Sequence, residues 1–227
     1  MIRRLAGVVS RPRTTLAEVV LAPKWAVTWS VILGIWALAG AGLLSTDVGR
    51  QALVDERVRA VEAFGGTIDD VEYASLEASP PWWVYAASGS RMLLTPPVTL
   101  ITAVAVWLAA RRDGTDATFS QALALVVHAN VALLVGQLIA TPLHYVRESL
   151  TSPLHLAAIL PLMEEGSPQA RFFGTMDLFA LWWAGLLAVG LSVLTGQRVG
   201  RYLAPLAAVF AVFAAVVAVA VMAMGGA

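Results

Sequence analysis

The stretch ATFSQALALVVHANVALLVGQLIATPLHYV, residues 117–146, contains no charged side chain. A helix needs about 20 apolar residues to cross the roughly 30 Å hydrocarbon core of a bilayer. Every backbone amide in lipid must be bonded within its own segment, so a run of this length predicts a transmembrane helix. The same run holds His128, Asn130 and Gln137, which are costly to place in lipid and are therefore candidate functional residues.

Four further charge-free runs are present, two before this one and two after it. The chain is 59% hydrophobic and 13% charged, whereas soluble domains carry about 25% charge. Period-2 alternation, which would indicate an outer-membrane barrel, is not present. We therefore expect one all-α polytopic membrane bundle over 1–227, with about five transmembrane helices and additional interfacial amphipathic helices. The expected spans are 25–46, 92–110, 119–141, 178–197 and 202–224, with a leading segment over 1–24 and outer loops over 47–91 and 142–177.

The distribution of basic residues predicts the orientation. Nine lie before the first span or in the short loops after the second and fourth spans, and six lie in the other two loops. The nine are Arg3, Arg4, Arg11, Arg13, Lys24, Arg111, Arg112, Arg198 and Arg201. The positive-inside rule then places the N-terminus in the cytoplasm and the C-terminus outside.

Composition excludes several functional classes. The formal net charge is zero, which argues against nucleic-acid binding. The chain has no cysteine, so disulfides, thiolate nucleophiles and cysteine-ligated metals are excluded. We find no nucleophile elbow, phosphate-binding loop, dinucleotide fingerprint or HExxH zinc motif. We therefore expect neither enzymatic activity nor a cofactor.

The loop after the first span predicts a helix outside the membrane. Val54, Val58 and Val61 repeat at i, i+4 and i+7, which is typical of an amphipathic helix. Such a helix lies on the bundle or on the lipid surface, or it docks a partner. The segment that follows contains paired tryptophans, Trp82 and Trp83, typical of the interface, and Pro96-Pro97 predicts a kinked or restarted second span. The apolar segment 154–162 is too short to span and predicts an interfacial or partly re-entrant helix.

The polar residues in the spans have two interpretations. Asn130 and Gln137 are seven positions apart and share a helix face, while His128 points roughly the opposite way from Asn130. Hydrogen bonds between helices are the simpler interpretation, and a proton relay or transport path is the alternative.

Charged residues at the span ends have equally open roles. We expect Asp177 to cap the fourth span. Arg91 either extends to the headgroups or pairs with Asp177. The candidate functional residues in or near the bundle are therefore Arg91, His128, Asn130, Gln137, His144, Arg147, Glu148 and Asp177.

The second outer loop offers a weak metal-site hypothesis. His144 and Glu148 are four apart and His155 follows, so with Glu164 or Glu165 they supply nitrogen and oxygen ligands. The spacing matches no known motif, and we expect no metal.

Small residues recur every four positions on three spans. The rows are Ala37 and Ala41, Ala184 and Ala188, and Ala207, Ala211 and Ala215. Such rows allow close helix packing, either within the chain or between copies of it.

The layout as a whole resembles the Yip family of polytopic membrane proteins, in particular its bacterial branch. The residues that carry the resemblance are Ser10-Arg11-Pro12-Arg13-Thr14-Thr15, Pro23, Gln121-Ala122-Leu123-Ala124, His128, Gln137, Tyr145-Val146-Arg147-Glu148-Ser149-Leu150, Asp177-Leu178-Phe179 and Trp182-Trp183. The resemblance implies five spans, a cytoplasmic N-terminus and an outward C-terminus in a bacterial inner membrane. Eukaryotic members are linked to small GTPases and vesicle trafficking, but their Asp-Leu-Tyr-Gly-Pro signature is not present, and we do not carry that link over.

Three functions follow from these observations. The first is a non-enzymatic protein that organises membrane lipids or partner proteins, whether a membrane protein or a second copy of the chain. The second is a small transporter or channel subunit that uses the polar residues in the bundle. The third and weakest is an intramembrane enzyme.

Overall fold

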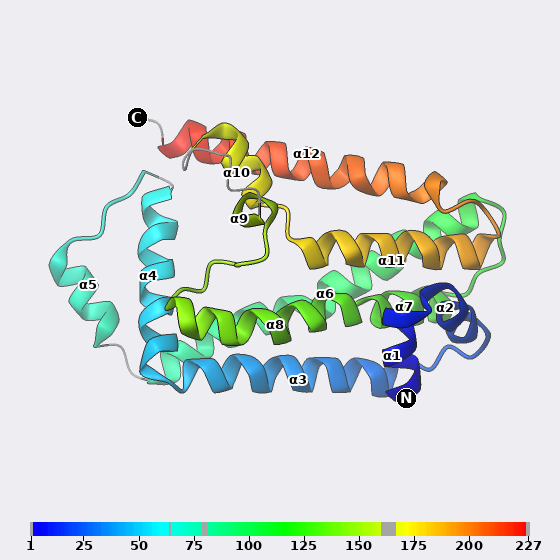
Figure 1. The fold of residues 1–227 in the computed structure, drawn as a ribbon, viewed down its shortest axis with the longest axis horizontal. Coiled ribbons are helices and arrows are strands. Elements are labelled where there is room, and N and C mark those ends of the chain that lie inside the picture. Colours follow the sequence, from blue (N-terminus) through cyan, green and yellow to red (C-terminus); the bar gives the residue numbers. More distant parts are fainter. Residues whose placement is uncertain (1, 64, 79–80, 160–166, 226–227) are drawn as a thin grey trace. The chain divides into compact units, whose positions relative to one another are not determined.

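The computed structural model describes residues 2–63, 65–78, 81–159 and 167–225. These residues form helices and one isolated β-bridge, and five helical segments are long and apolar enough to span a membrane (Figure 1). The expected all-α polytopic bundle is confirmed. The helices are α1 (Ile2–Ser10), α2 (Pro12–Leu21), α3 (Ala26–Leu44), α4 (Asp47–Ala63), α5 (Asp70–Glu77), α6 (Pro81–Arg112), α7 (Phe119–Ala129), α8 (Val131–Arg147), α9 (Leu156–Ile159), α10 (Pro168–Gly174), α11 (Leu178–Thr195) and α12 (Gly200–Gly225).

The chain divides into two compact units. The first comprises Met1–Ala37, Arg91–Gly136 and Phe179–Val209, and the second comprises Leu38–Ser90, Gln137–Leu178 and Phe210–Ala227. The candidate spans are Ala26–Leu44, Leu93–Arg112, Phe119–Arg147, Leu178–Thr195 and Gly200–Val217.

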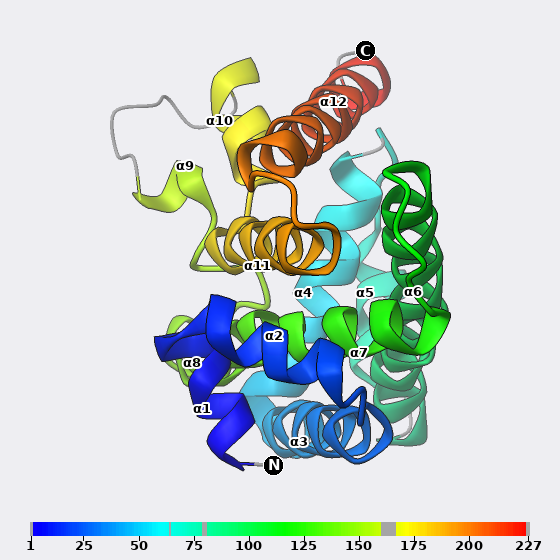
Figure 2. The ribbon, with the colours of Figure 1, turned by 90° about the vertical axis from the view of Figure 1, so that its right-hand side faces the viewer.

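In the first unit the N-terminal segment forms a helical hairpin of α1 and α2, which lies beside α7 (Figures 1 and 2). Val8, Leu16 and Val19 of the hairpin are fully buried. The two helices cross closely, because a Cβ atom on Gly7 would stand 2.5 Å from the hydroxyl oxygen of Thr15. The Arg4 guanidinium donates to the carbonyl oxygens of Ala22 and Glu18, at 3.1 and 3.4 Å, and so satisfies the end of α2.

Helix α7 begins with a capping box and runs into the core of the first unit. The amide of Gln121 donates to the Thr118 hydroxyl, and the Gln121 side chain accepts from the Thr118 amide. The Gln121 side chain also donates to the carbonyl of Val20, 3.2 Å away, and thereby links α7 to α2. Residues 122–129 are all buried.

Helix α6 is continuous across Pro96 and Pro97, so of the two predicted alternatives, a kink or a restart of the second span, the restart is wrong. The two prolines remove two amide donors from the helix, a loss that transmembrane helices tolerate when nearby hydroxyls bond to the backbone. The Thr99 hydroxyl donates to the carbonyl of Thr95, and the Thr102 hydroxyl donates to that of Val98, both at 2.8 Å.

In the second unit a sharp corner joins the end of α3 to α4. The carbonyl oxygen of Leu43 accepts from the amide and the hydroxyl of Thr46, and the Thr46 hydroxyl in turn accepts from the amide of Gly49. A Cβ atom on Gly49 would overlap the Leu43 carbonyl oxygen, so the corner requires glycine. Beyond it, Leu44, Leu53 and the half-buried Leu150 form a small apolar cluster.

The helix predicted in the loop after the first span is present as α4, followed by the shorter α5. Asp69 caps α5 by accepting from the amide of Glu72 at 2.7 Å. The Tyr73 hydroxyl of α5 donates to the Asp55 carboxylate of α4 at 3.1 Å and accepts from the Gln51 amide at 2.6 Å. The Asp55 hydrogen bond raises the pKa of Tyr73 above its usual value.

Two of the three rows of small residues have different environments. Ala184 and Ala188 on α11 are buried, at 5% and 0% exposure. Ala207 and Ala215 on α12 are exposed, and Ala211 is half-buried. The row on the fourth span therefore packs within the chain, whereas the row on the fifth span lies largely on the surface.

Candidate functional site

Asn130 interrupts the third span within the first unit. It forms the C-cap of α7, and α8 starts at the next residue. Two buried polar side chains lie at this break, His128 with 0% exposure and Asn130 with 5%. In a span otherwise made of apolar residues, these are the side chains whose hydrogen bonds must be accounted for.

His128 is bonded through both ring nitrogens. Nδ1 lies 2.7 Å from the carbonyl oxygen of Ala124, which can only accept, so Nδ1 carries the proton. Nε2 then accepts from the hydroxyl of Thr28 on α3, at 3.4 Å. This arrangement uses the neutral imidazole as a hydrogen-bonded link between the first and third spans.

Asn130 connects two other spans. Its amide nitrogen donates to the Thr99 hydroxyl on α6 at 3.3 Å, and its amide oxygen accepts from the Trp183 indole nitrogen on α11 at 2.9 Å. His128 and Asn130 therefore bond to different neighbours, as expected from their spacing along the helix. Together the two residues link the third span to the first, second and fourth.

Gln137 has a different role from Asn130. Its side-chain amide donates to the hydroxyl of Thr141 at 3.2 Å, and that hydroxyl donates to the Gln137 carbonyl at 2.7 Å. Both contacts lie within α8. The seven-residue spacing predicted that Asn130 and Gln137 share a helix face. It did not predict this difference, because Asn130 lies at the break between α7 and α8 and Gln137 lies within α8.

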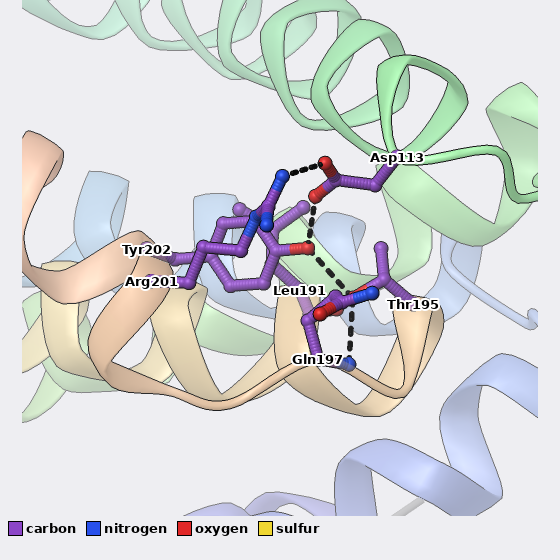
Figure 3. A network of polar contacts seen from close by, with 6 residues as sticks. All are labelled: Asp113, Leu191, Thr195, Gln197, Arg201 and Tyr202. Carbon is purple, nitrogen blue, oxygen red and sulfur yellow. Dashed lines mark hydrogen bonds and ion pairs between the residues drawn. The ribbon is translucent and has the colours of Figure 1, made fainter.

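A second polar cluster in the first unit joins the end of α6 to the start of α12 (Figure 3). We call Asp113, Thr195, Arg201 and Tyr202 the Asp113 cluster. The Asp113 carboxylate accepts from the Arg201 guanidinium at 2.6 Å and from the Tyr202 hydroxyl at 2.5 Å. The Thr195 hydroxyl oxygen lies 2.7 Å from the Tyr202 hydroxyl oxygen and accepts from the amide of Gln197 at 3.3 Å.

The Asp113 cluster holds an ionised carboxylate away from solvent. The Asp113 side chain is 7% exposed, although the paired Arg201 side chain is 57% exposed. The Tyr202 hydrogen bond, followed by the bond and charge of Arg201, lowers the pKa of Asp113 below its usual value and outweighs the opposing effect of burial. The carboxylate is therefore charged at neutral pH and fixes the first turn of α12.

The sequence interpretation missed the Asp113 cluster. Asp113 directly follows Arg111 and Arg112 in a short loop, and it has the appearance of a solvated loop residue. The one available signal was Tyr202 beside Arg201 at the start of a span, where a phenol and a guanidinium can meet an acid from another loop.

The candidate residues at the end of the third span terminate a helix. Glu148 has a left-handed backbone, with φ of 51°. Its amide donates to the Tyr145 carbonyl at 3.3 Å, and the Ser149 amide donates to the His144 carbonyl at 3.2 Å, which together form a Schellman motif. The His144 Nδ1–H also donates to the Ser149 carbonyl oxygen at 2.8 Å, and Arg147, the last residue of α8, is exposed.

Asp177 lies immediately before α11 in the second unit. Its carboxylate accepts from the Ser152 hydroxyl at 2.9 Å, and its backbone forms the isolated bridge with His155. His155 Nδ1 accepts from the amide of Ala158 at 2.9 Å. These contacts hold Asp177 against the loop before α9.

The metal-site hypothesis gains no support from these placements. Among the described residues no group of three or more His, Asp or Glu side chains is arranged to hold a metal, and Glu164 and Glu165 lie outside the described residues. Arg91 lies on α6, but its side chain is outside the described part of the structure, so its predicted pairing with Asp177 is not tested.

Comparison with known proteins identifies a family. The sequence profile of the Yip1 domain matches residues 6–222. Searches of curated proteins and of solved structures found no significant match. The profile match covers almost all of the chain, and the five apolar helices agree with a membrane protein of this type. The chain therefore belongs to the Yip1 domain family.

Proposed function

We propose that the protein is a non-enzymatic member of the bacterial branch of the Yip family that organises membrane lipids or partner proteins. Its N-terminus lies in the cytoplasm and its C-terminus outside the inner membrane, as the positive-inside rule favours. Its partners are membrane lipids, together with another membrane protein or a second copy of the chain, and it binds neither a cofactor nor nucleic acid.

The observation that carries this proposal is the bonding of the buried polar residues in the third span. His128 bonds to Ala124 and Thr28, and Asn130 bonds to Thr99 and Trp183. Hydrogen bonds of this kind hold transmembrane helices together. A residue that carries a proton or binds cargo must exchange hydrogen-bond partners. Both ring nitrogens of His128, and the side-chain nitrogen and oxygen of Asn130, already bond to groups within the bundle.

The remaining surface favours interaction over chemistry. Many large apolar side chains on the spans are exposed, among them Leu38, Ile101 and Phe213. In a membrane such side chains contact lipid tails or another spanning helix. Because hydrogen bonds within the chain hold the spans together, the exposed apolar side chains can contact lipid tails or a partner helix. A protein that organises lipids or partners needs such contacts.

Reconstitution of the full chain tests the proposal. The purified protein is incorporated into liposomes, and vesicle size and shape are compared by electron cryo-microscopy with protein-free liposomes prepared in the same way. In parallel, the chain is extracted with a mild detergent, and the lipids and proteins that remain bound are identified by mass spectrometry. We expect altered vesicle shape, a selected lipid class or a stoichiometric membrane-protein partner.

Two results would count against the proposal. Unchanged vesicles together with unselective lipid retention and no bound protein would remove its basis. Ion or proton flux that requires His128, measured against a His128→Ala variant with the same thermal stability, would establish the transporter alternative instead.

A further inference from the structure

Among the described residues of the first unit, the α1–α2 hairpin packs against α7. Its buried residues Val8, Leu16 and Val19 belong to the side that faces the remainder of the first unit, and Gln121 bonds to the end of α2. On the other side Ile2, Ala6 and Val9 follow one another at i, i+4 and i+7, and all three are exposed. Within the described part of the first unit, the hairpin is therefore a docked element with an exposed, partly apolar face.

The exposed apolar side chains gather close to the start of the first span. Ile2 is 77% exposed and Leu21 is 85% exposed. Because Arg4 bonds to the carbonyls of Glu18 and Ala22, the start of α1 lies against the end of α2, and these two residues occupy the same end of the hairpin. The first span begins at Ala26, five residues after Leu21, a distance of at most about 17 Å along the chain.

The charged residues of the segment 2–24 are almost all positive. Arg3, Arg11, Arg13 and Lys24 are exposed, and Glu18 is the one acidic residue of the segment 2–24. The Glu18 carboxylate lies 3.5 Å from the Arg3 guanidinium, so the only negative charge is already paired. Arg3 and Lys24 are close in sequence to Ile2 and Leu21, and Arg11 and Arg13 flank the turn that follows Val9. Basic and exposed apolar side chains on one short segment are typical of helices that lie on an anionic membrane surface.

We propose that the exposed face of the α1–α2 hairpin binds the anionic headgroups of the leaflet in which the first span begins. Arg3, Arg11, Arg13 and Lys24 contact the phosphate-bearing headgroups, while Ile2 and Leu21 enter the boundary with the acyl chains. The proposal rests on the proposed function and names the lipid class that the protein would organise. An acidic protein would match the charges, but the adjacent membrane boundary also accommodates the apolar side chains.

The absence of cysteine from the sequence allows a specific test. Ala6→Cys places a nitroxide label between Ile2 and Val9 without altering a charge or an apolar contact. The labelled full chain is placed in nanodiscs of phosphatidylcholine alone or of an equal mixture with phosphatidylglycerol, and the depth of the label is measured from its accessibility to oxygen and to a water-soluble nickel complex. An Ala74→Cys label on the exposed surface of α5 is the matched control.

We expect the Ala6→Cys label to lie deeper in the anionic discs, and the Ala74→Cys label to be indifferent to lipid charge. Each Arg or Lys changed to Gln should lower the ratio of immersed to free hairpin about fivefold. Glu18→Gln should act in the opposite direction, because it releases Arg3 from its ion pair. High salt should reproduce the loss without any substitution, which separates charge recognition from misfolding.

A label that is shallow in both kinds of disc would overturn the inference and indicate a soluble partner for this face. Equal immersion in neutral and anionic discs would show apolar insertion without charge recognition and would also overturn it. If either occurs while the full chain still reshapes vesicles or retains a partner, the proposed function stands without this inference. An immersed label in a chain that alters neither lipids nor partners would instead contradict the proposed function.

Discussion

The third and fifth spans have nearly equal hydropathy but opposite environments. In the most apolar window of the third span, Phe119–Arg147, 72% of the residues are buried, against 11% in that of the fifth, Gly200–Val217. The third span carries the buried His128 and Asn130, whereas the fifth is fixed at its first turn by Tyr202 and exposes Val209, Val212 and Phe213 beyond it. Hydropathy therefore locates both spans, whereas the buried polar residues His128 and Asn130 belong to the span that is mostly buried.

Gly136→Leu should have the largest effect of the changes that probe this difference. A Cβ atom at Gly136 would stand 2.7 Å from the ring of Phe179 on α11, so a larger side chain must displace a packed aromatic ring. We expect a loss of about 3 kcal/mol in the free energy of unfolding, the upper part of the range for overpacking.

The matched control for Gly136→Leu is Ala207→Leu on the exposed row of the fifth span, which should change stability by less than about 0.5 kcal/mol. Equilibrium unfolding in bicelles measures both variants. Equal effects at the two positions would show that the two spans do not differ in the way described.

Asn130→Leu should have the next largest effect. The substitution leaves the Trp183 indole N–H without its acceptor and removes the donor to the Thr99 hydroxyl, which keeps its bond to Thr95, and we expect a loss of about 2 kcal/mol. Gln137→Leu on the same span should lower the free energy of unfolding by about 0.6 kcal/mol or less, because the Gln137 side chain donates to Thr141 of its own helix. A double-mutant cycle with Trp183→Phe checks the assignment, and additive effects would contradict the proposed link between the third and fourth spans.

The smallest effect should be a pH dependence that originates at the first turn of the fifth span. The usual pKa of an aspartate is near 3.8, and the Tyr202 hydrogen bond is the largest cause that lowers the pKa of Asp113. A lowered folded-state pKa means that the stabilisation is complete above the usual pKa and is lost as the pH falls through the lowered value.

The free energy of unfolding is measured across this acidic range. In Tyr202→Phe the stability supplied by ionised Asp113 should be lost at a higher pH than in the unaltered protein. In Asp113→Asn this stabilisation should be missing at every pH. At neutral pH both variants should be less destabilised than Asn130→Leu. An unchanged acid profile in Tyr202→Phe would show that the phenol does not hold the charge of Asp113.

The extent to which the sequence predicts this protein depends on how local each feature is. The number of spans follows from runs of uncharged residues, and this prediction is confirmed because hydrophobicity is a property of contiguous segments. The contacts of Asn130 are made with residues 31 and 53 positions away, and no periodicity specifies such partners. Asp113 was missed for the same reason, since Arg201 is 88 positions later.

The N-terminal segment illustrates a partial prediction. Its basic charge was recognised and used to assign orientation, but its two docked helices were not predicted. Pro12 interrupts the periodicity between them, and each helix is too short to be stable in isolation. Burial of Leu16 and Val19 supplies the packing that stabilises them, and that packing is a tertiary effect.

The corner at Gly49 has a consequence for the natural variation of this family. Alanine, the smallest possible replacement, would already overlap the carbonyl oxygen of Leu43. Relatives that keep this turn should therefore retain glycine at the equivalent position, even where the surrounding helix has diverged beyond recognition. A relative with any other residue there should connect its first span to the following helix along a different path, so this one position should divide the family by the geometry of the loop after the first span.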